Sequence, residues 1–435
     1  MPPLAPTTST ATLPTAAASQ GDARLASRMD VISGEGALDV FLRARALEAM
    51  GRRVVHLELG EPDFPTPEHV VEAGVRALQA GDTKYSSPRG LPELREAIVA
   101  TLAQRHITAT PQEIVVTPGA KPMVFYAMLA LVEPGAEVLF PDPGFPIYPS
   151  AARFAGGIPV AYGLRGDAGY APDLDEMAAR ITPRTRVLVL NAPHNPSGGA
   201  ISSSELERIA ELVERHDLAV ITDDVYARLV YGSDDTPRGS DAPDVSHSSE
   251  APGTAPSIAA LDGMRARTII IDSFSKTYAM TGWRLGYGVV PAHAVERLVT
   301  LAVNGHTCTP VFVQRAGIAA LTGPQEPVRA MREEFARRRA LVVRGLSAIP
   351  GVRCPAPAGA FYVFPDLTRV LAPHGLTAED FATRLLEEHG VAALTGTAFG
   401  ARGEGHIRIS FAAAASDLAF AVDRLRECVQ AIGSA

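Results

Sequence analysis

Residues 272–287 read DSFSKTYAMTGWRLGY and follow an apolar run that has the pattern of a buried strand. Lys276 lies just beyond that strand among small hydroxyl residues, and Arg284 follows it in the same stretch. Partial burial lowers the pKa of a lysine and favours the neutral amine that forms a Schiff base with an aldehyde. Ser273, Ser275 and Arg284 together can hold a phosphate group. The stretch therefore predicts a reactive lysine beside an anion site at the end of a strand.

The rarity of lysine supports this interpretation. Only Lys84, Lys121 and Lys276 are lysines among the 40 basic residues, so arginine occupies every other cationic position. An arginine does not lose its proton near neutrality, so a position that needs a free amine has to keep lysine. We therefore expect Lys276 to be chemically active and Lys84 to be a surface residue.

Short β-branched runs alternate with amphipathic segments on both sides of this stretch, as they do in α/β proteins. Helices are predicted over 92–106 and 121–132. The predicted strands of this part of the chain are 54–59, 113–117, 137–140, 186–191, 218–222, 268–272 and 285–290. This order predicts a mostly parallel sheet with helices on both faces, in which ligands bind at the carboxyl ends of the strands.

The pattern changes after residue 305 to long helices rich in Arg and Glu, such as 327–348, and three short strands at 361–364, 391–394 and 406–411. We therefore predict a large domain at 60–305 and a smaller α/β domain at 306–435, which the segment 28–59 joins. Composition predicts a disordered tail at 1–27 and a flexible surface insertion at 232–256.

Composition also argues against several classes of protein. The net charge is −8 and basic residues do not cluster, which disfavours nucleic-acid binding; the arginines at 337–339 are predicted to form a solvated helix face. Cys308, Cys354 and Cys428 are too few for a disulfide framework or a zinc site, and no metal is expected. No apolar run approaches the roughly 20 residues that span a bilayer, and the first residues lack the features of a signal peptide. We expect a cytoplasmic globular protein.

Two further segments place polar residues at the ends of predicted strands. Residues 191–199, NAPHNPSGG, contain Asn195, and residues 222–226, TDDVY, contain Asp223 and Tyr226. A carboxylate that faces a lysine from a neighbouring strand end suits pyridoxal phosphate chemistry, because it keeps the pyridine nitrogen protonated. The alternatives are that Asp223 caps a helix and that Asn195 only forms a turn.

These motifs resemble those of the class I aminotransferases of the aspartate aminotransferase group, which share the fold type I architecture of pyridoxal-phosphate enzymes. The resemblance extends over roughly residues 28–430, and the motifs occur in the order of the family. It implies an α/β enzyme with pyridoxal 5′-phosphate as cofactor and an amino acid, such as aspartate, glutamate or an aromatic one, and a 2-oxo acid as substrates. It also implies a homodimer with shared active sites.

The resemblance implies a role for each matching residue. Lys276 would form the Schiff base and move the α-proton, and Asp223 would pair with the pyridine nitrogen. Tyr226 and Asn195 would hydrogen-bond the phenolic oxygen of the cofactor. The other implied cofactor contacts are stacking by Phe145, phosphate binding by Ser273, Ser275, Arg284 and the backbone of Gly119, Ala120 and Lys121, and a contact from Tyr85 of the other subunit.

The implied substrate contacts centre on Arg408, which would bind the α-carboxylate as a planar fork, with Asn195 and the backbone of Gly60 nearby. Lys121 matches a lysine that meets the distal carboxylate of an acidic substrate in bacterial aspartate aminotransferases. Four departures from the family pattern are Asp224 in place of the commoner Glu, Phe145 in place of Tyr or Trp, Pro122 directly after Lys121, and a stretch at 232–256 that is longer than the corresponding loop in typical members.

Several alternatives stay open at this point. The same scaffold supports a C–S lyase and other biosynthetic reactions, including oxidation and decarboxylation, and it also occurs in regulators that carry a DNA-binding module ahead of it. Only a polar, Ala-rich tail precedes the resemblance here. Single residues also have purely structural alternatives. Lys121 would be an ordinary first-turn residue of a helix, Arg284 and Arg408 would form surface ion pairs, and Tyr85 and Phe145 would pack in the core.

Overall fold

The computed structural model describes residues 25–32, 34, 36–232 and 253–434. Most of the predicted tail at 1–27 and most of the predicted insertion at 232–256 lie outside these residues. Both therefore stay predictions.

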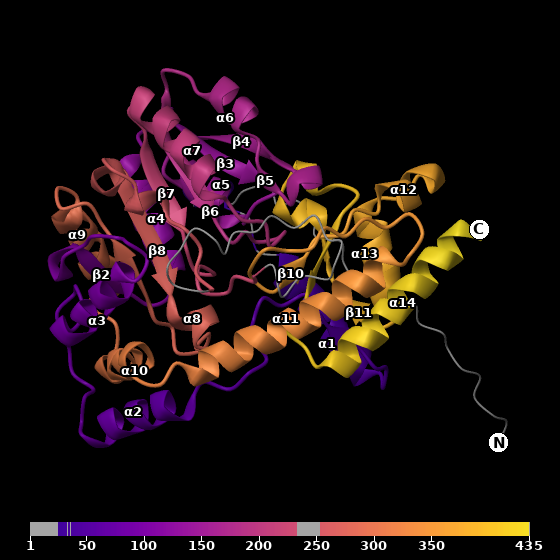
Figure 1. Cartoon of the computed structure of the whole chain (residues 1–435), viewed down its shortest axis with the longest axis horizontal. Coiled ribbons are helices and arrows are strands. Elements are labelled where there is room, and N and C mark those ends of the chain that lie inside the picture. Colours follow the sequence, from indigo (N-terminus) through magenta and orange to yellow (C-terminus); the bar gives the residue numbers. More distant parts are fainter. Residues whose placement is uncertain (1–24, 33, 35, 233–252, 435) are drawn as a thin grey trace.

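An eight-stranded sheet forms the core of the larger part of the molecule (Figure 1), in the order β2-β9-β8-β7-β6-β3-β4-β5. The strands from β4 through β3, β6 and β7 to β8 pair in parallel, whereas β8–β9, β9–β2 and β4–β5 are antiparallel pairs. The bounds are β2 (Ile114–Thr117), β3 (Glu137–Asp142), β4 (Ile158–Arg165), β5 (Ala171–Pro172), β6 (Thr185–Asn191), β7 (Ala219–Asp223), β8 (Thr268–Ser273) and β9 (Gly286–Val289). The predicted mostly parallel sheet is confirmed.

Helices cover both faces of this sheet, because its strands are apolar on both sides. In β6, Val187 and Val189 belong to one apolar cluster, while Leu188 and Leu190 belong to another. The first cluster includes α4 (Lys121–Leu131), α5 (Ile147–Phe154) and α9 (Val295–His306); the second includes α6 (Leu174–Arg180) and α7 (Ser203–Arg215); a third joins α2 (Glu68–Gln79), α3 (Pro92–Ala103) and α10 (Val311–Thr322) to the sheet.

The C-terminal part of the chain forms smaller sheets with their own core. Strands β10 (Tyr362–Val363), β13 (Ile407–Ser410) and β12 (Leu394–Thr395) form one antiparallel sheet, and β1 (Val55–His56) pairs in parallel with β11 (Val391–Ala392). The helices of this part are α1 (Gly36–Ala49), α11 (Glu326–Ser347), α12 (Thr368–Leu371), α13 (Ala378–Glu387) and α14 (Ala415–Gly433). Their core includes Phe335, Phe361, Phe381 and Phe411. The N-terminal segment thus lies with the C-terminal part, while the exact domain boundaries stay predictions.

The predicted solvated face at 337–339 is wrong for two of its three arginines. Arg338 is buried and forms an ion pair with Asp63 at 2.7 Å. Arg339 is buried and donates from Nε to the carbonyl oxygen of Pro357 at 2.6 Å. The reason is the position of α11, which extends from the region of α8 (Phe274–Thr277) and α10 to that of α13 and α14 (Figure 1). From Met331 onward one side of this helix, with Phe335 and Leu346, packs into the core of the C-terminal part, and Arg338 and Arg339 are buried with it.

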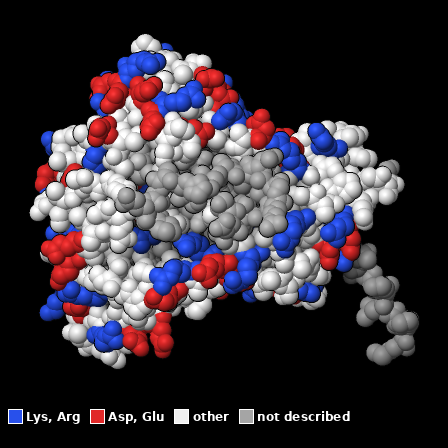
Figure 2. All heavy atoms as spheres, viewed as in Figure 1, with Lys and Arg blue, Asp and Glu red and all other residues white. Residues whose placement is uncertain are grey.

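Acidic and basic side chains are intermixed on the face of the molecule shown in Figure 2, where the described residues form no continuous basic patch. Within the described ranges, the helices are too short or too polar to cross a membrane. The described residues also contain no cluster of His, Cys, Asp and Glu that could hold a metal ion.

Candidate active site

A cavity of about 400 Å³ lies where the carboxyl ends of β6, β7 and β8 meet the small sheet. This volume is within the range typical of small-molecule sites. The predicted residues that line it are Gly60, Ala120, Lys121, Phe145, Asn195, Asp223, Tyr226, Ser273, Ser275, Lys276, Arg284 and Arg408. The fold therefore brings together residues that lie far apart in the sequence.

Lys276 lies in the short helix α8, which starts directly after β8. Its Nζ donates a hydrogen bond to the carbonyl oxygen of Gly60. Burial lowers the pKa of the Lys276 amine from 10.5 to about 8, and the positive charge of Arg408 acts in the same direction. A sizeable fraction of the amine is therefore neutral near physiological pH, as a nucleophile requires.

Asp223 is the last residue of β7 and is buried. Its Oδ2 accepts a hydrogen bond from the hydroxyl of Tyr148 at 2.7 Å. Burial raises the pKa of Asp223 to about 6, although the bond from Tyr148 favours the carboxylate. A buried carboxylate of this kind gains stability from a cation brought beside it, and a protonated pyridine nitrogen is such a partner.

Arg408, from β13, is held on two sides. Its Nη1 donates to Oδ1 of Asn195 at 3.1 Å, and its Nη2 donates to the carbonyl oxygen of Glu58. The backbone N–H of Asn195 is in turn fixed by Oδ1 of Asn191 at 2.9 Å. The guanidinium plane is therefore oriented before any ligand binds, as a carboxylate site requires.

The other end of the cavity is suited to a phosphate group. Gly119 has a φ of +83°, and a Cβ at this position would collide with the guanidinium of Arg284. Arg284 donates to the carbonyl oxygen of Thr281 at 2.7 Å, which holds it beside the start of α4. Ser273 and Ser275 line the same cavity. Two hydroxyls and a guanidinium thus line this end of the cavity, beside the start of α4.

The structure places Lys121 and Tyr85 differently. Lys121 and Phe145 both line the cavity, and the Nζ of Lys121 lies 5.6 Å from the ring centroid of Phe145. Tyr85 is 87% exposed and is absent from the cavity lining. The structure therefore does not bring Tyr85 to the site within one chain.

Two tyrosines that line the cavity were not predicted. Tyr148 holds Asp223, and the hydroxyl of Tyr362 lies 2.7 Å from that of Tyr226. Tyr148 follows Phe145 in the same segment, and Tyr362 lies within 359–364, GAFYVF. A tyrosine within an apolar run is a signal that could have identified both residues, because a tyrosine hydroxyl that is buried needs a hydrogen-bond partner.

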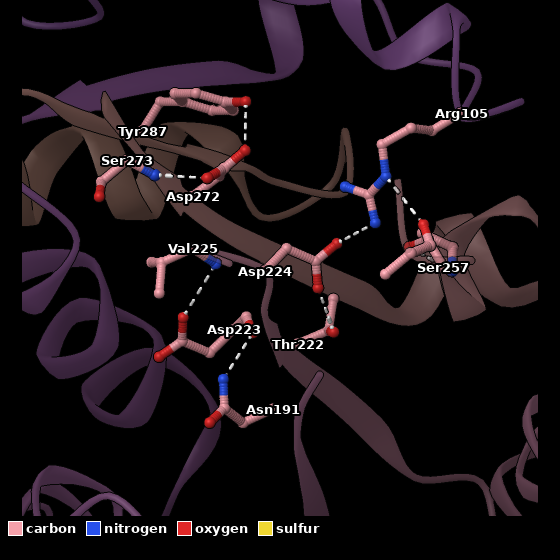
Figure 3. Close-up of polar contacts among 12 residues, drawn as sticks. Arg105, Asn191, Thr222, Asp223, Asp224, Val225, Ser257, Asp272, Ser273 and Tyr287 are labelled. Atoms are coloured by element: carbon pink, nitrogen blue, oxygen red, sulfur yellow. Dashed lines mark hydrogen bonds and ion pairs between the residues drawn. The ribbon is translucent and has the colours of Figure 1, made fainter. Parts of the chain in front are cut away.

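Asp224 gives a buried ion pair behind the cavity. Figure 3 shows Asp223 and Asp224 pointing in different directions from the end of β7. Asp224 Oδ2 lies 2.8 Å from Nη2 of Arg105, and both side chains are 4% exposed. Thr222 donates to the other carboxylate oxygen of Asp224 at 2.6 Å. The aspartate that departs from the family pattern is therefore fully partnered.

Replacing Arg105 by methionine should lower the free energy of unfolding by about 3–5 kcal/mol, because the carboxylate of Asp224 would stay buried without its cation. Urea unfolding of the two proteins measures the difference. The double variant Arg105→Met/Asp224→Asn should recover part of the loss. Equal losses in the single and double variants would contradict a role for the charge of Asp224.

The amine of Lys276 should make the stability of the cofactor-free protein depend on pH. Above about pH 10.5 the amine is neutral in both states; between pH 10.5 and 8 the unfolded chain binds a proton and the folded protein does not, so stability falls as the pH falls. Relative to Lys276→Ala, the wild type should therefore lose at least about 1 kcal/mol between pH ~10.5 and pH ~7. Urea unfolding at both pH values tests this, with Lys84→Ala as a control that follows the wild type. A pH-independent difference between wild type and Lys276→Ala would refute it.

These residues fit pyridoxal 5′-phosphate. One part of the cavity is lined by the amine of Lys276, the buried carboxylate of Asp223 and the ring of Phe145. Another part is lined by Arg284, which lies against Gly119. Each group has the chemistry that the aldehyde, the pyridine ring or the phosphate of this cofactor needs.

The chain is similar to known proteins over most of its length. Residues 52–425 match the family described as aminotransferase class I and II. The chain is 38% identical to an aspartate aminotransferase of Pyrococcus abyssi, over 93% of this chain and 98% of that protein. It is 35% identical to aromatic-amino-acid aminotransferase 2 of Thermococcus litoralis, over 93% of this chain and 98% of that protein.

Among solved structures, the chain is similar to the aspartate aminotransferase from Thermus thermophilus with maleate. The TM-score is 0.83 at 34% identity, and the match covers 93% of this chain and 99% of that one. The chain therefore belongs to the class I and II aminotransferases and is an enzyme that uses pyridoxal 5′-phosphate to transfer amino groups.

Proposed function

We propose that this protein transfers the α-amino group of an acidic amino acid, aspartate or glutamate, to a 2-oxo acid. The observation that carries the proposal is the charge of the cavity lining. Four cationic residues line it, Lys121, Lys276, Arg284 and Arg408, against two carboxylates, Glu61 and Asp223. In a chain with a net charge of −8, this local excess of positive charge favours ligands that carry a phosphate and two carboxylates.

Lys276, Asp223, Tyr226 and Asn195 would act on the cofactor. When bound, pyridoxal 5′-phosphate supplies an electrophilic aldehyde and a ring that accepts electrons from the substrate α-carbon. Lys276 would remove the proton from the α-carbon of the substrate and deliver it to C4′ of the cofactor, because its lowered pKa suits both tasks. Asp223 would keep the pyridine nitrogen protonated, and Tyr226 would donate to the phenolic oxygen.

Further residues would hold the ends of the cofactor and the substrate. Phe145 would stack on the ring, while Ser273, Ser275, Arg284 and the backbone at Gly119, Ala120 and Lys121 would hold the phosphate. Arg408 would bind the α-carboxylate beside Asn195 and Gly60, and the Lys121 amine would meet the distal carboxylate. The maleate in the Thermus thermophilus structure is a dicarboxylate, which supports an acidic substrate for this related chain.

We also propose that the enzyme is a homodimer in the cytoplasm. Tyr85 is 87% exposed, and Val71, Val75 and Leu78 of α2 are 38%, 45% and 47% exposed. These apolar side chains lie close together on one face of the helix, where a second subunit would cover them. Tyr85 would then reach the phosphate of the other subunit. The cysteines are free, which suits a reducing compartment.

Activity assays with a matched variant test the proposed substrate. The purified enzyme is given aspartate, glutamate, phenylalanine or cystathionine, each with and without 2-oxoglutarate. Aspartate should undergo repeated turnover only with the acceptor present, and Lys121→Met should raise the KM for aspartate by roughly 10-fold or more while leaving that for phenylalanine within about 2-fold. Pyruvate and ammonia formed without an acceptor would favour a lyase and overturn the proposal, as would failure to accept either acidic amino acid.

A further inference from the structure

Tyr362 lies between two residues of the proposed site and has no role in the assignments above. It comes from β10, is 1% exposed and lines the cavity. Its hydroxyl oxygen lies 2.7 Å from the hydroxyl oxygen of Tyr226, and the Cζ of Arg408 lies 4.6 Å from its ring centroid. The hydroxyl of Tyr362 thus contacts Tyr226, a proposed cofactor contact, and its ring contacts Arg408, the proposed carboxylate site.

The hydroxyl of Tyr362 determines which way Tyr226 can donate. Each phenol carries one proton, so in a bond between two phenols one donates and the other accepts. If Tyr226 donates to the cofactor, its proton points into the cavity and its oxygen accepts from Tyr362. A hydroxyl that accepts one hydrogen bond becomes a better donor in the next, because the two bonds polarise each other.

The backbone around Gly60 leaves room for this arrangement. A Cβ at Gly60 would collide with the hydroxyl of Tyr362, so glycine permits the close approach. The carbonyl oxygen of the same residue accepts the hydrogen bond from Lys276. Tyr362 is therefore fixed between Gly60 and Tyr226, close to the reactive amine.

The ring of Tyr362 acts on Arg408. The guanidinium lies over this ring and also 4.9 Å from the ring centroid of Phe399. Hydrogen bonds to Asn195 and Glu58 use the edge of the guanidinium, whereas aromatic rings contact its faces. The rings therefore fix the tilt of the guanidinium plane, and the hydrogen bonds fix the rotation of the guanidinium within that plane.

We propose that Tyr362 is a positioning residue with two separable tasks: its hydroxyl directs the proton of Tyr226 into the cavity, and its ring orients the guanidinium of Arg408. This inference rests on the proposed function, because it assumes that Tyr226 meets the cofactor and Arg408 the α-carboxylate. The inference adds Tyr362, a residue of the small sheet, as a link between the contact of Tyr226 with the cofactor and the contact of Arg408 with the α-carboxylate.

Two variants of the holoenzyme separate the tasks. Tyr362→Phe removes only the hydroxyl, and Tyr362→Leu removes hydroxyl and ring. The first readout is the apparent pKa of the visible absorbance band of the bound cofactor, and the second is the Kd of maleate, measured from the change in that band. Tyr162→Phe is the matched control, because its buried hydroxyl bonds the carbonyl oxygen of Val189 at 2.9 Å and Tyr162 is not among the residues that line the cavity.

Tyr362→Phe should raise the apparent pKa by roughly 0.5 to 1 unit, since a weaker bond from Tyr226 stabilises the deprotonated form less. Its Kd for maleate should stay within about 2-fold of the wild type. Tyr362→Leu should show the same pKa rise and a Kd weakened by roughly 3- to 10-fold. Tyr162→Phe should match the wild type in both readouts.

A second pair of variants tests the path through Tyr226. In a Tyr226→Phe background, Tyr362→Phe should shift the apparent pKa by much less than it does alone, because the bond it acts through is gone. An unchanged pKa in Tyr362→Phe, or an equal shift in both backgrounds, would overturn the role of the hydroxyl. Equal Kd values for Tyr362→Phe and Tyr362→Leu would overturn the role of the ring. A wild-type holoenzyme that does not bind maleate would overturn the proposed function itself, because that function needs a site for a dicarboxylate.

Discussion

Replacing Lys276 by alanine should lower the rate of transamination by roughly 10⁴-fold, the upper end of what a general acid–base group contributes. The variant loses both the nucleophilic amine and the base that would move the α-proton. Other cationic groups cannot take over, because a guanidinium is neither a nucleophile nor a base near neutrality and Lys121 lies at a different part of the lining, beside Phe145. Single-turnover assays with an amino acid and bound cofactor measure the loss.

The chain offers a matched control for this experiment. Lys84 is exposed and does not line the cavity, so Lys84→Ala should retain the activity of the wild type. Borohydride reduction should attach the cofactor to Lys276 in the wild type and in Lys84→Ala. Turnover by Lys276→Ala at the wild-type rate would remove the basis of the assigned mechanism.

Replacing Arg408 by glutamine should lower kcat/KM for an amino acid by roughly 10²- to 10³-fold. The substrate carboxylate would enter a largely buried site without its charged partner, and losing one member of such a pair costs about 2–5 kcal/mol. Arg408→Lys should recover only part of the activity, because an ammonium lacks the planar fork that matches a carboxylate. Steady-state kinetics over a range of substrate concentrations measure both variants.

An amine substrate without a carboxylate is the control for Arg408. It should be turned over at the same slow rate by the wild type and by Arg408→Gln, because Arg408 has nothing to bind in it. A similar loss with both substrates would show that the substitution disturbs the fold, since Arg408 also holds Asn195 and the carbonyl group of Glu58.

The local pattern of the sequence predicts the strands of the large sheet well and its surroundings less well. The run before Lys276 is apolar and β-branched, and β8 forms there because both faces of the strand are buried. Strands β4 and β5 were not predicted, since β4 alternates less clearly, with four of its eight residues only half-buried, and β5 has only two residues. The predicted strand at 391–394 divides into β11 and β12, which pair with different strands.

The site shows the same limit. Lys276 and Asp223 could be predicted because Asp223 ends a strand and Lys276 lies just beyond one, each within a recognisable segment, so local sequence contains the signal. Arg105 and Tyr362 could not, because their partners lie far away in the chain and arginine is abundant in it. The misassigned Arg338 and Arg339 have the same cause, since a charged side chain at helical spacing predicts solvent unless its partners are known.

The pairing of β1 with β11 has a consequence for how the protein is made. During synthesis, Val55 and His56 leave the ribosome long before Val391 and Ala392 exist, and the backbone groups that form this pair must wait for them. The strands of the large sheet are contiguous in between, so that sheet can assemble while the early segment is still unpaired. The part that holds Arg408 is completed last. Lys276 and Asp223 can therefore reach their places in a nascent chain before the carboxylate-binding site around Arg408 exists.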